Sequence, residues 1–177
     1  EELAALDAKA WLQKLPIKHM LQNGWVENQT DHENLYRNCL KFFKINTHAE
    51  WNNVYGSIEE SLAFKTSPTY DQVPEAVGAW FRRCEYIASQ QATATFDVEK
   101  LKGSLPSLRA LTRVKDPRVF IAELQAICAR SGVAVVLVPA PKGCRATAAA
   151  YQVNSEKFMI ALSLRYKTDD HFWFALF

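Results

Sequence analysis

The amino-acid sequence predicts an α+β fold that is predominantly helical. A helical N-terminal part is expected to pack on a small, mostly antiparallel sheet of about three strands, followed by a C-terminal helix. Apolar residues recur at intervals of three and four through most of the chain before Gly132, which is typical of amphipathic helices. After Gly132, the run "VAVVLV" is apolar and mostly β-branched, which indicates a buried strand. The last segment, "TDDHFWFALF", begins with helix-capping residues.

Helix ends are marked along the first part of the chain. Pro16 separates two expected helices, and Asn23-Gly24 closes the second. Asp31 can cap the next helix, whose predicted stripe is Leu35, Cys39 and Phe42. A further helix is expected between Thr47 and Gly56.

The central segment 72–91 gives the firmest helix prediction. It holds one stripe of apolar residues at alternating spacings of four and three: Val73, Val77, Trp80, Cys84 and Ile87. Arg82 and Arg83 are expected at the solvent edge beside this stripe. The preceding segment 66–74 is rich in turn-forming residues and is expected to be a loop.

Local signals also divide the stretch before the sheet. Gly103 and Pro106 are expected to break the segment 96–114 into two short helices. Asp116 and Pro117 then predict a helix start, and Gly132 its end.

Two weaker strand candidates, 146–153 and 157–164, follow the buried strand. The residues "NSEK" between them suit a hairpin turn. We therefore predict two regions: a helical spacer over 1–66, and helices plus a small sheet over 67–177.

The C-terminal helix should begin at Thr168 or Asp169. The residues after it are apolar all round, as in a helix buried on every side, and no Gly, Asn, Lys or Arg closes it. The chain also starts at Glu1, inside a helical pattern. We therefore expect an internal piece of a longer protein.

Composition excludes several classes of protein. The 177 residues are 49% hydrophobic, which is enough for a sizeable core, and the net charge of +2 gives no general affinity for nucleic acid. The printed sequence opens without a signal-peptide pattern and holds no apolar run of membrane-spanning length, so we expect neither secretion nor a membrane span. The four cysteines are widely spaced, and three of them sit at helical spacing among apolar residues. The expected location is the reducing cytoplasm, with no membrane association.

Motifs for catalysis are lacking in the sequence. The histidines His19, His32, His48 and His171 stand alone, whereas a zinc site needs three or four convergent ligands. We expect no enzymatic activity, metal or cofactor from these residues.

One basic segment could bind an acidic partner or nucleic acid. Between residues 100 and 118 a single acid, Asp116, accompanies six cations, and Arg109 and Arg113 are spaced to share a helix face. No aromatic residue is interleaved for base stacking, so a solvated helix face is the main alternative. The candidate patch consists of Lys100, Lys102, Arg109, Arg113, Lys115 and Arg118.

The segment 132–177 resembles the ImmA/IrrE family of zinc metallopeptidases, most specifically over 162–177, "LSLRYKTDDHFWFALF". In that family a small sheet leads into such a segment and then directly into an H-E-L-G-H motif. The family's zinc histidines and glutamate would follow Phe177, so the resemblance assigns none of them here, and zinc is implied only for a longer parent. Segments 7–26, 42–45 and 79–88 are similar to the helical spacer of longer members, which resemble HigA-type antitoxins and other XRE-family regulators. Those members carry a helix-turn-helix domain before the spacer.

The resemblance implies a regulatory or partner-binding fragment of an XRE-family transcriptional regulator or toxin–antitoxin antitoxin. DNA would bind through the absent N-terminal domain, and the partner would be a cognate toxin or regulatory protein. Homodimerisation stays open. One alternative is an inactive remnant of an ImmA/IrrE-type zinc metallopeptidase that cleaves a repressor. Another is a simple helical adaptor that binds protein through residues 100–118.

Overall fold

The structure is a computed structural model that describes residues 2–28, 31–58, 63–66, 73–164 and 169–177. The chain forms two compact units. Unit 1 comprises residues 1–61, 67–83 and 140–145, and unit 2 comprises residues 62–66, 84–139 and 146–177. Each unit thus combines segments that are distant in the sequence. The predicted regions 1–66 and 67–177 remain a prediction.

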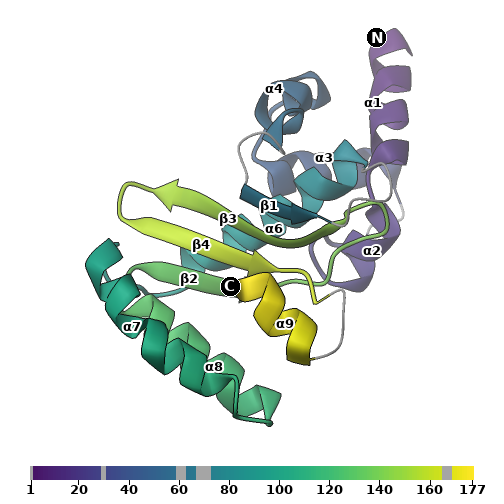
Figure 1. The fold of residues 1–177 in the computed structure, drawn as a ribbon. Helices are drawn as coiled ribbons and strands as arrows, with labels where there is room; N and C mark the ends of the chain where they lie inside the picture. Colours follow the sequence, from purple (N-terminus) through teal and green to yellow (C-terminus); the bar gives the residue numbers. More distant parts are fainter. Residues whose placement is uncertain (1, 29–30, 59–62, 67–72, 165–168) are drawn as a thin grey trace. The chain divides into compact units, whose positions relative to one another are not determined.

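The predominantly helical α+β fold is confirmed. The elements of unit 1 are helical: α1 (Glu2–Lys14), α2 (Ile17–Gln22), α3 (His32–Phe43), η1 (His48–Glu50), α4 (Trp51–Tyr55) and the first part of α6 (Pro74–Gln90) (Figure 1). The predicted boundaries hold at Pro16, which separates α1 from α2, and at Gly24, which adopts a positive φ of 63° after α2. Asp31 caps α3 through its carboxylate, which accepts from the backbone N–H of Glu33.

The last carbonyls of α3 are hydrogen-bonded both by the adjoining backbone and by side chains from other helices. The backbone N–H of Lys44, which has a left-handed conformation, bonds the carbonyls of Leu40 and Lys41. The carbonyl of Phe43 accepts from the Tyr55 hydroxyl at 2.7 Å, and that of Phe42 accepts from Nε of Arg82 at 2.8 Å. These bonds satisfy carbonyls that a helix end leaves without an intrahelical partner.

Arg82 corrects a sequence-based prediction. It was expected at a solvent edge, but its side chain is only 4% exposed. Arg82 can be buried because its Nε donates to the carbonyl of Phe42 in α3, 40 residues earlier. A buried guanidinium is stable only when its donors are hydrogen-bonded.

The Tyr55 hydroxyl should contribute measurably to stability. We expect Tyr55→Phe to lower the free energy of unfolding by about 1–2 kcal/mol, because the Phe43 carbonyl loses a buried donor. Tyr36→Phe is the matched control, since the Tyr36 hydroxyl bonds Nδ1 of His48 at a half-buried site where water can replace it. Urea unfolding followed by circular dichroism measures both. A Tyr36→Phe loss as large as that of Tyr55→Phe would contradict this account.

Unit 2 is built on a four-stranded sheet with the order β1-β3-β4-β2 (Figure 1). The strands are β1 (Ala63–Thr66), β2 (Val133–Leu137), β3 (Ala146–Asn154) and β4 (Lys157–Leu162). β3 pairs antiparallel with β1 and β4, whereas β2 pairs parallel with β4. The three predicted strands and the hairpin after Asn154 are therefore confirmed. The sequence missed β1, which is only four residues long and carries no extended alternation.

The edge strand β2 is protected by side chains. The carbonyl of Val135 accepts from the amides of Gln91 and Gln125, at 3.1 and 2.9 Å. Such bonds occupy groups that an edge strand would otherwise offer to another chain.

Helix α7 (Val98–Leu111) is continuous, so the predicted break between Gly103 and Pro106 is wrong. Pro106 cannot bond the carbonyl of Lys102, but both residues are exposed, and solvent can hydrate that carbonyl. Leu108 and Leu111, after the proline, are buried in the same core against which Leu101 packs. Packing on both sides of the proline therefore outweighs its local effect.

Helices α7, α8 (Pro117–Ala129) and α9 (Asp169–Leu176) all contribute to the core that includes Val133, Val135 and Leu162 of the sheet. Asp116 and Pro117 begin α8 as predicted. The predicted burial of the last helix on every side is wrong. Trp173 is buried, whereas Phe174 and Phe177 are 75% and 54% exposed.

Candidate functional site

Metal-binding side chains do not converge in the part of the chain that the structure describes. No group of three His, Cys, Asp or Glu side chains there could hold a metal ion. The ring of His19 packs edge-to-face against Trp25, and Nδ1 of His48 lies 3.0 Å from the Tyr36 hydroxyl. The side chain of His171 lies outside the described residues. The family resemblance assigns no zinc ligand to this chain, and the described residues offer no other group of three such side chains.

The four cysteines are buried thiols. Burial raises the pKa of Cys39 to about 12 and that of Cys128 to about 11. A nucleophilic cysteine requires a lowered pKa, so neither of these two has the character of a catalytic residue.

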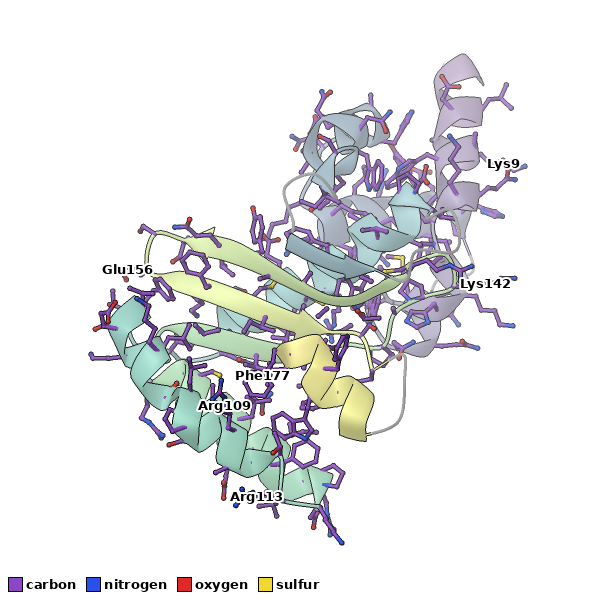
Figure 2. The ribbon with its side chains drawn as sticks, viewed as in Figure 1. Lys9, Arg109, Arg113, Lys142, Glu156 and Phe177 are labelled. Atoms are coloured by element: carbon purple, nitrogen blue, oxygen red, sulfur yellow. The ribbon has the colours of Figure 1, made fainter. Side chains whose placement is uncertain are left out.

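The six predicted patch residues divide into two groups. Lys100 and Lys102 lie in the first turns of α7, while the other four lie near the turn between α7 and α8. Figure 2 shows two of these four, Arg109 and Arg113. Lys100 and Arg109 are nine positions apart, which corresponds to roughly 13.5 Å along the helix axis. Because α7 ends at Leu111, Arg113 lies in the following turn, and the predicted sharing of one helix face with Arg109 is wrong.

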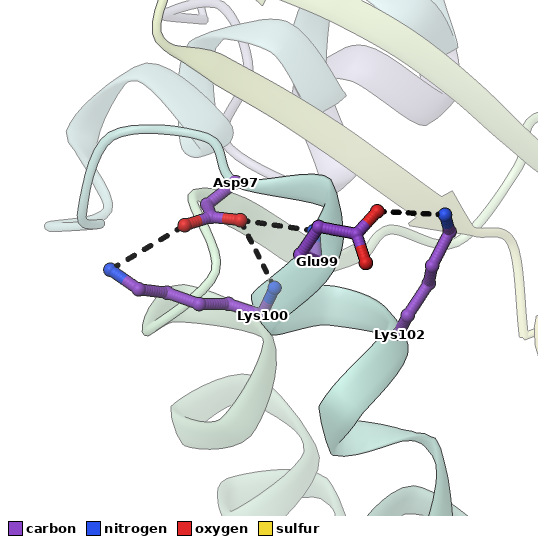
Figure 3. A network of polar contacts seen from close by, with 4 residues as sticks. All are labelled: Asp97, Glu99, Lys100 and Lys102. Atoms are coloured by element: carbon purple, nitrogen blue, oxygen red, sulfur yellow. Dashed lines mark hydrogen bonds and ion pairs between the residues drawn. The ribbon is translucent and has the colours of Figure 1, made fainter.

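Nearby acids neutralise half of the patch. Lys100 lies 3.7 Å from the carboxylate of Asp97, and Lys102 bonds Glu99 at 2.8 Å (Figure 3). Arg118 forms a bidentate ion pair with Asp116: its Nε donates to Oδ1 at 3.1 Å and its Nη2 to Oδ2 at 2.9 Å. Arg109, Arg113 and Lys115 form no ion pair with the described residues. The six-residue patch stays a prediction.

Asp97 and Asp116 act as helix N-caps. Backbone donation from Lys100, then from Glu99, together with the Lys100 charge, holds the pKa of Asp97 below its ordinary value. The Arg118 side chain, followed by its backbone N–H, lowers the pKa of Asp116. Both carboxylates are therefore bonded in their charged form at the positive ends of α7 and α8.

These caps predict an acid-sensitive contribution to stability. A lowered pKa stabilises the fold at pH values above the unfolded-state pKa of about 4, and the contribution disappears as the pH falls through the folded-state pKa. We expect Asp97→Asn/Asp116→Asn to be less stable than the native chain at pH 7, with the difference vanishing by roughly pH 2. Thermal unfolding across this range measures it. Glu123→Gln, which removes an exposed carboxylate within α8 that caps no helix, is the control. A difference independent of pH would contradict the charge assignment.

Unit 1 contains a groove that the sequence did not reveal. Its volume is about 930 Å³, and its walls come from the end of α1, from α2, from the start of α3, and from segments 73–76 and 142–145. Figure 2 shows Lys9 and Lys142 extending to the same side of unit 1. The cationic wall residues are Lys9, Lys14, Lys18, Lys142 and Arg145.

No protein-family model, curated protein or solved structure matches this chain.

Local sequence gave only a partial signal for this groove. Lys9, Lys14 and Lys18 recur at intervals of five and four across Pro16, beside the apolar Leu12 and Leu15. Lys142 and Arg145 join them from more than 120 positions further along the chain, so only the fold brings the set together. No helix of the described residues has both the length and the apolar character needed to cross a bilayer.

Proposed function

We propose that this chain is the regulatory, partner-binding part of an XRE-family DNA-binding regulator or toxin–antitoxin antitoxin. The DNA-reading helix-turn-helix domain would belong to a longer parent protein, and the partner would be a cognate toxin or regulatory protein in the cytoplasm. The proposal rests on the resemblance of residues 162–177 to the ImmA/IrrE family.

The observation that supports this proposal is the placement of α9. The resemblance implies a small sheet that leads directly into a helix, and α9 follows β4 within the segment that carries the resemblance. Trp173 packs on Phe120 of α8 with ring centroids 5.1 Å apart, so α9 is anchored in the core of unit 2. This order of elements agrees with the expected domain.

A gel-shift assay tests the assignment of DNA binding. The parent protein and the 177-residue chain would each be titrated onto the promoter DNA of the parent's own gene. We expect a shift with the parent and none with the chain. A salt-dependent, sequence-specific shift by the chain alone would refute the placement of the DNA-reading element outside it.

Partner binding requires a separate test. The protein encoded next to the parent's gene would be purified and mixed with this chain, and the complex measured by size-exclusion chromatography with light scattering. Co-elution at a defined stoichiometry is expected. Separate elution of both proteins, with the parent also failing to bind, would remove the partner-binding role.

The same helix supports a second candidate, a remnant of a zinc metallopeptidase that cleaves a repressor. This candidate predicts about one zinc per chain in the parent protein and proteolysis of a partner, measured by elemental analysis and by gel electrophoresis. This chain alone should contain no stoichiometric zinc, because its described residues form no suitable ligand group. A zinc-free and proteolytically inactive parent would exclude this candidate.

A further inference from the structure

The groove of unit 1 combines a cationic rim with an apolar floor. Leu12, Leu15 and Ala76 of the floor are buried, and Ile17 and Leu35 are half-buried. The rim carries five cationic residues. Arg145 is half-buried, and the other four are exposed lysines: Lys9, Lys14, Lys18 and Lys142.

Acidic side chains are absent from the described wall of this groove. Unit 1 nevertheless has acids close by in sequence. Glu75 comes between the wall residues Val73 and Ala76 but is not part of the wall, and Glu33, next to His32, pairs with Arg37. Four exposed lysines therefore line this groove without a carboxylate among its described lining residues, which favours an anionic ligand.

The size of the groove favours a small molecule over a protein. A volume of about 930 Å³ lies within the range of small-molecule sites. The wall has 17 described residues, whereas a stable protein interface uses about 20–30 residues on each side.

We propose that this groove binds a small anionic amphiphile. The apolar body of the ligand lies on the floor formed by Leu12, Leu15 and Ala76, and its anionic head lies among the rim cations. This site is independent of the proposed regulatory function, because its binding can be measured without DNA or a protein partner.

Three probes with the same ten-carbon chain separate the contributions of charge and apolar body: decanoate, decanol and decyltrimethylammonium. Each would be titrated below its micellar concentration into the 177-residue chain by isothermal titration calorimetry. Quenching or enhancement of tryptophan fluorescence gives a second signal, since Trp25 packs against His19 of the wall with centroids 4.9 Å apart. We expect saturable 1:1 binding of decanoate, binding of decanol weaker by about tenfold or more, and no binding of the cation.

Charge reversal locates the site. Lys18→Glu/Lys142→Glu should weaken decanoate binding by about tenfold or more, because two rim cations become repulsive. Lys115→Glu, an exposed reversal in the turn between α7 and α8, should leave it unchanged. If the double reversal perturbs folding by circular dichroism, Lys18→Gln/Lys142→Gln replaces it, with weaker binding again expected.

Several results would overturn the proposal. These are an absence of saturable decanoate binding, equal binding of decanol and decanoate, or an equal effect of the Lys115 and double variants. An acidic amphipathic peptide that binds 1:1 more tightly than decanoate and displaces it would assign the groove to a protein partner instead.

Discussion

Replacing Gly132 with alanine is expected to destabilise the protein by about 2–5 kcal/mol. Gly132 has a φ of 78°, a conformation that costs an L-residue about 1–2 kcal/mol. A Cβ at this position would also lie 2.3 Å from the backbone N and Cα of Phe96. Forcing extra volume against fixed atoms costs about 1–3 kcal/mol more.

The backbone around Gly132 has little freedom to relax. The segment before α7 is hydrogen-bonded to the turn from α8 to β2. The N–H of Ala94 donates to the carbonyl of Ala129, and the N–H of Asp97 donates to the carbonyl of Ser131. The carbonyl of Gly132 itself accepts from the N–H of Phe158 at 3.0 Å. Shifting this turn would therefore strain hydrogen bonds on two sides.

Alanine substitutions at two other glycines separate the cost of the positive φ from the cost of steric overlap. Gly24 has a φ of 63° but open space around its Cβ position, so Gly24→Ala should cost only the conformational term of about 1–2 kcal/mol. Gly103 lies within α7 with neither restriction, and Gly103→Ala should stabilise by about 0.5–1 kcal/mol. Urea unfolding followed by circular dichroism orders the three variants. A Gly132→Ala loss no larger than that of Gly24→Ala would show that the close approach to Phe96 is wrong.

Gly132 also illustrates what the sequence can predict. The ends of helices depend on residues that act locally, and Pro16, Gly24, Asp31, Asp116 and Gly132 all mark the boundaries that were expected from them. The strand after Gly132 was equally predictable, because a β-branched apolar run needs no distant partner to be identified.

Features that depend on distant residues were not predictable in this way. The parallel pairing of β2 with β4 and the added strand β1 are set by tertiary packing. Arg82 is buried because the carbonyl of Phe42 needs a donor, and Pro106 stays within α7 because core packing continues beyond it. The cationic groove assembles from four stretches of unit 1, of which only the first shows a repeated pattern in the sequence.

The face that α3 buries gives the second large expected effect. The stripe predicted from the sequence placed Phe42 with Cys39, but Phe43 is the fully buried aromatic residue and Phe42 is half-buried. The Phe43 ring contacts those of Trp11, Trp51 and Tyr55, with centroids 5.9, 6.2 and 5.2 Å away. It therefore lies among aromatic side chains from α1 and α4.

Phe43→Ala should lower the free energy of unfolding by about 3–5 kcal/mol, because a fully buried ring is lost and the surrounding rings cannot collapse into its space. The Tyr55 hydroxyl keeps its backbone partner in this variant, so the loss reports packing alone. Phe42→Ala is the matched control. Its ring stacks on Trp25 at 6.2 Å but is only half-buried, so about 1–2 kcal/mol is expected. Urea unfolding measures the stability of both variants. A larger loss of unfolding free energy for Phe42→Ala than for Phe43→Ala would show that α3 buries Phe42, as the sequence predicted.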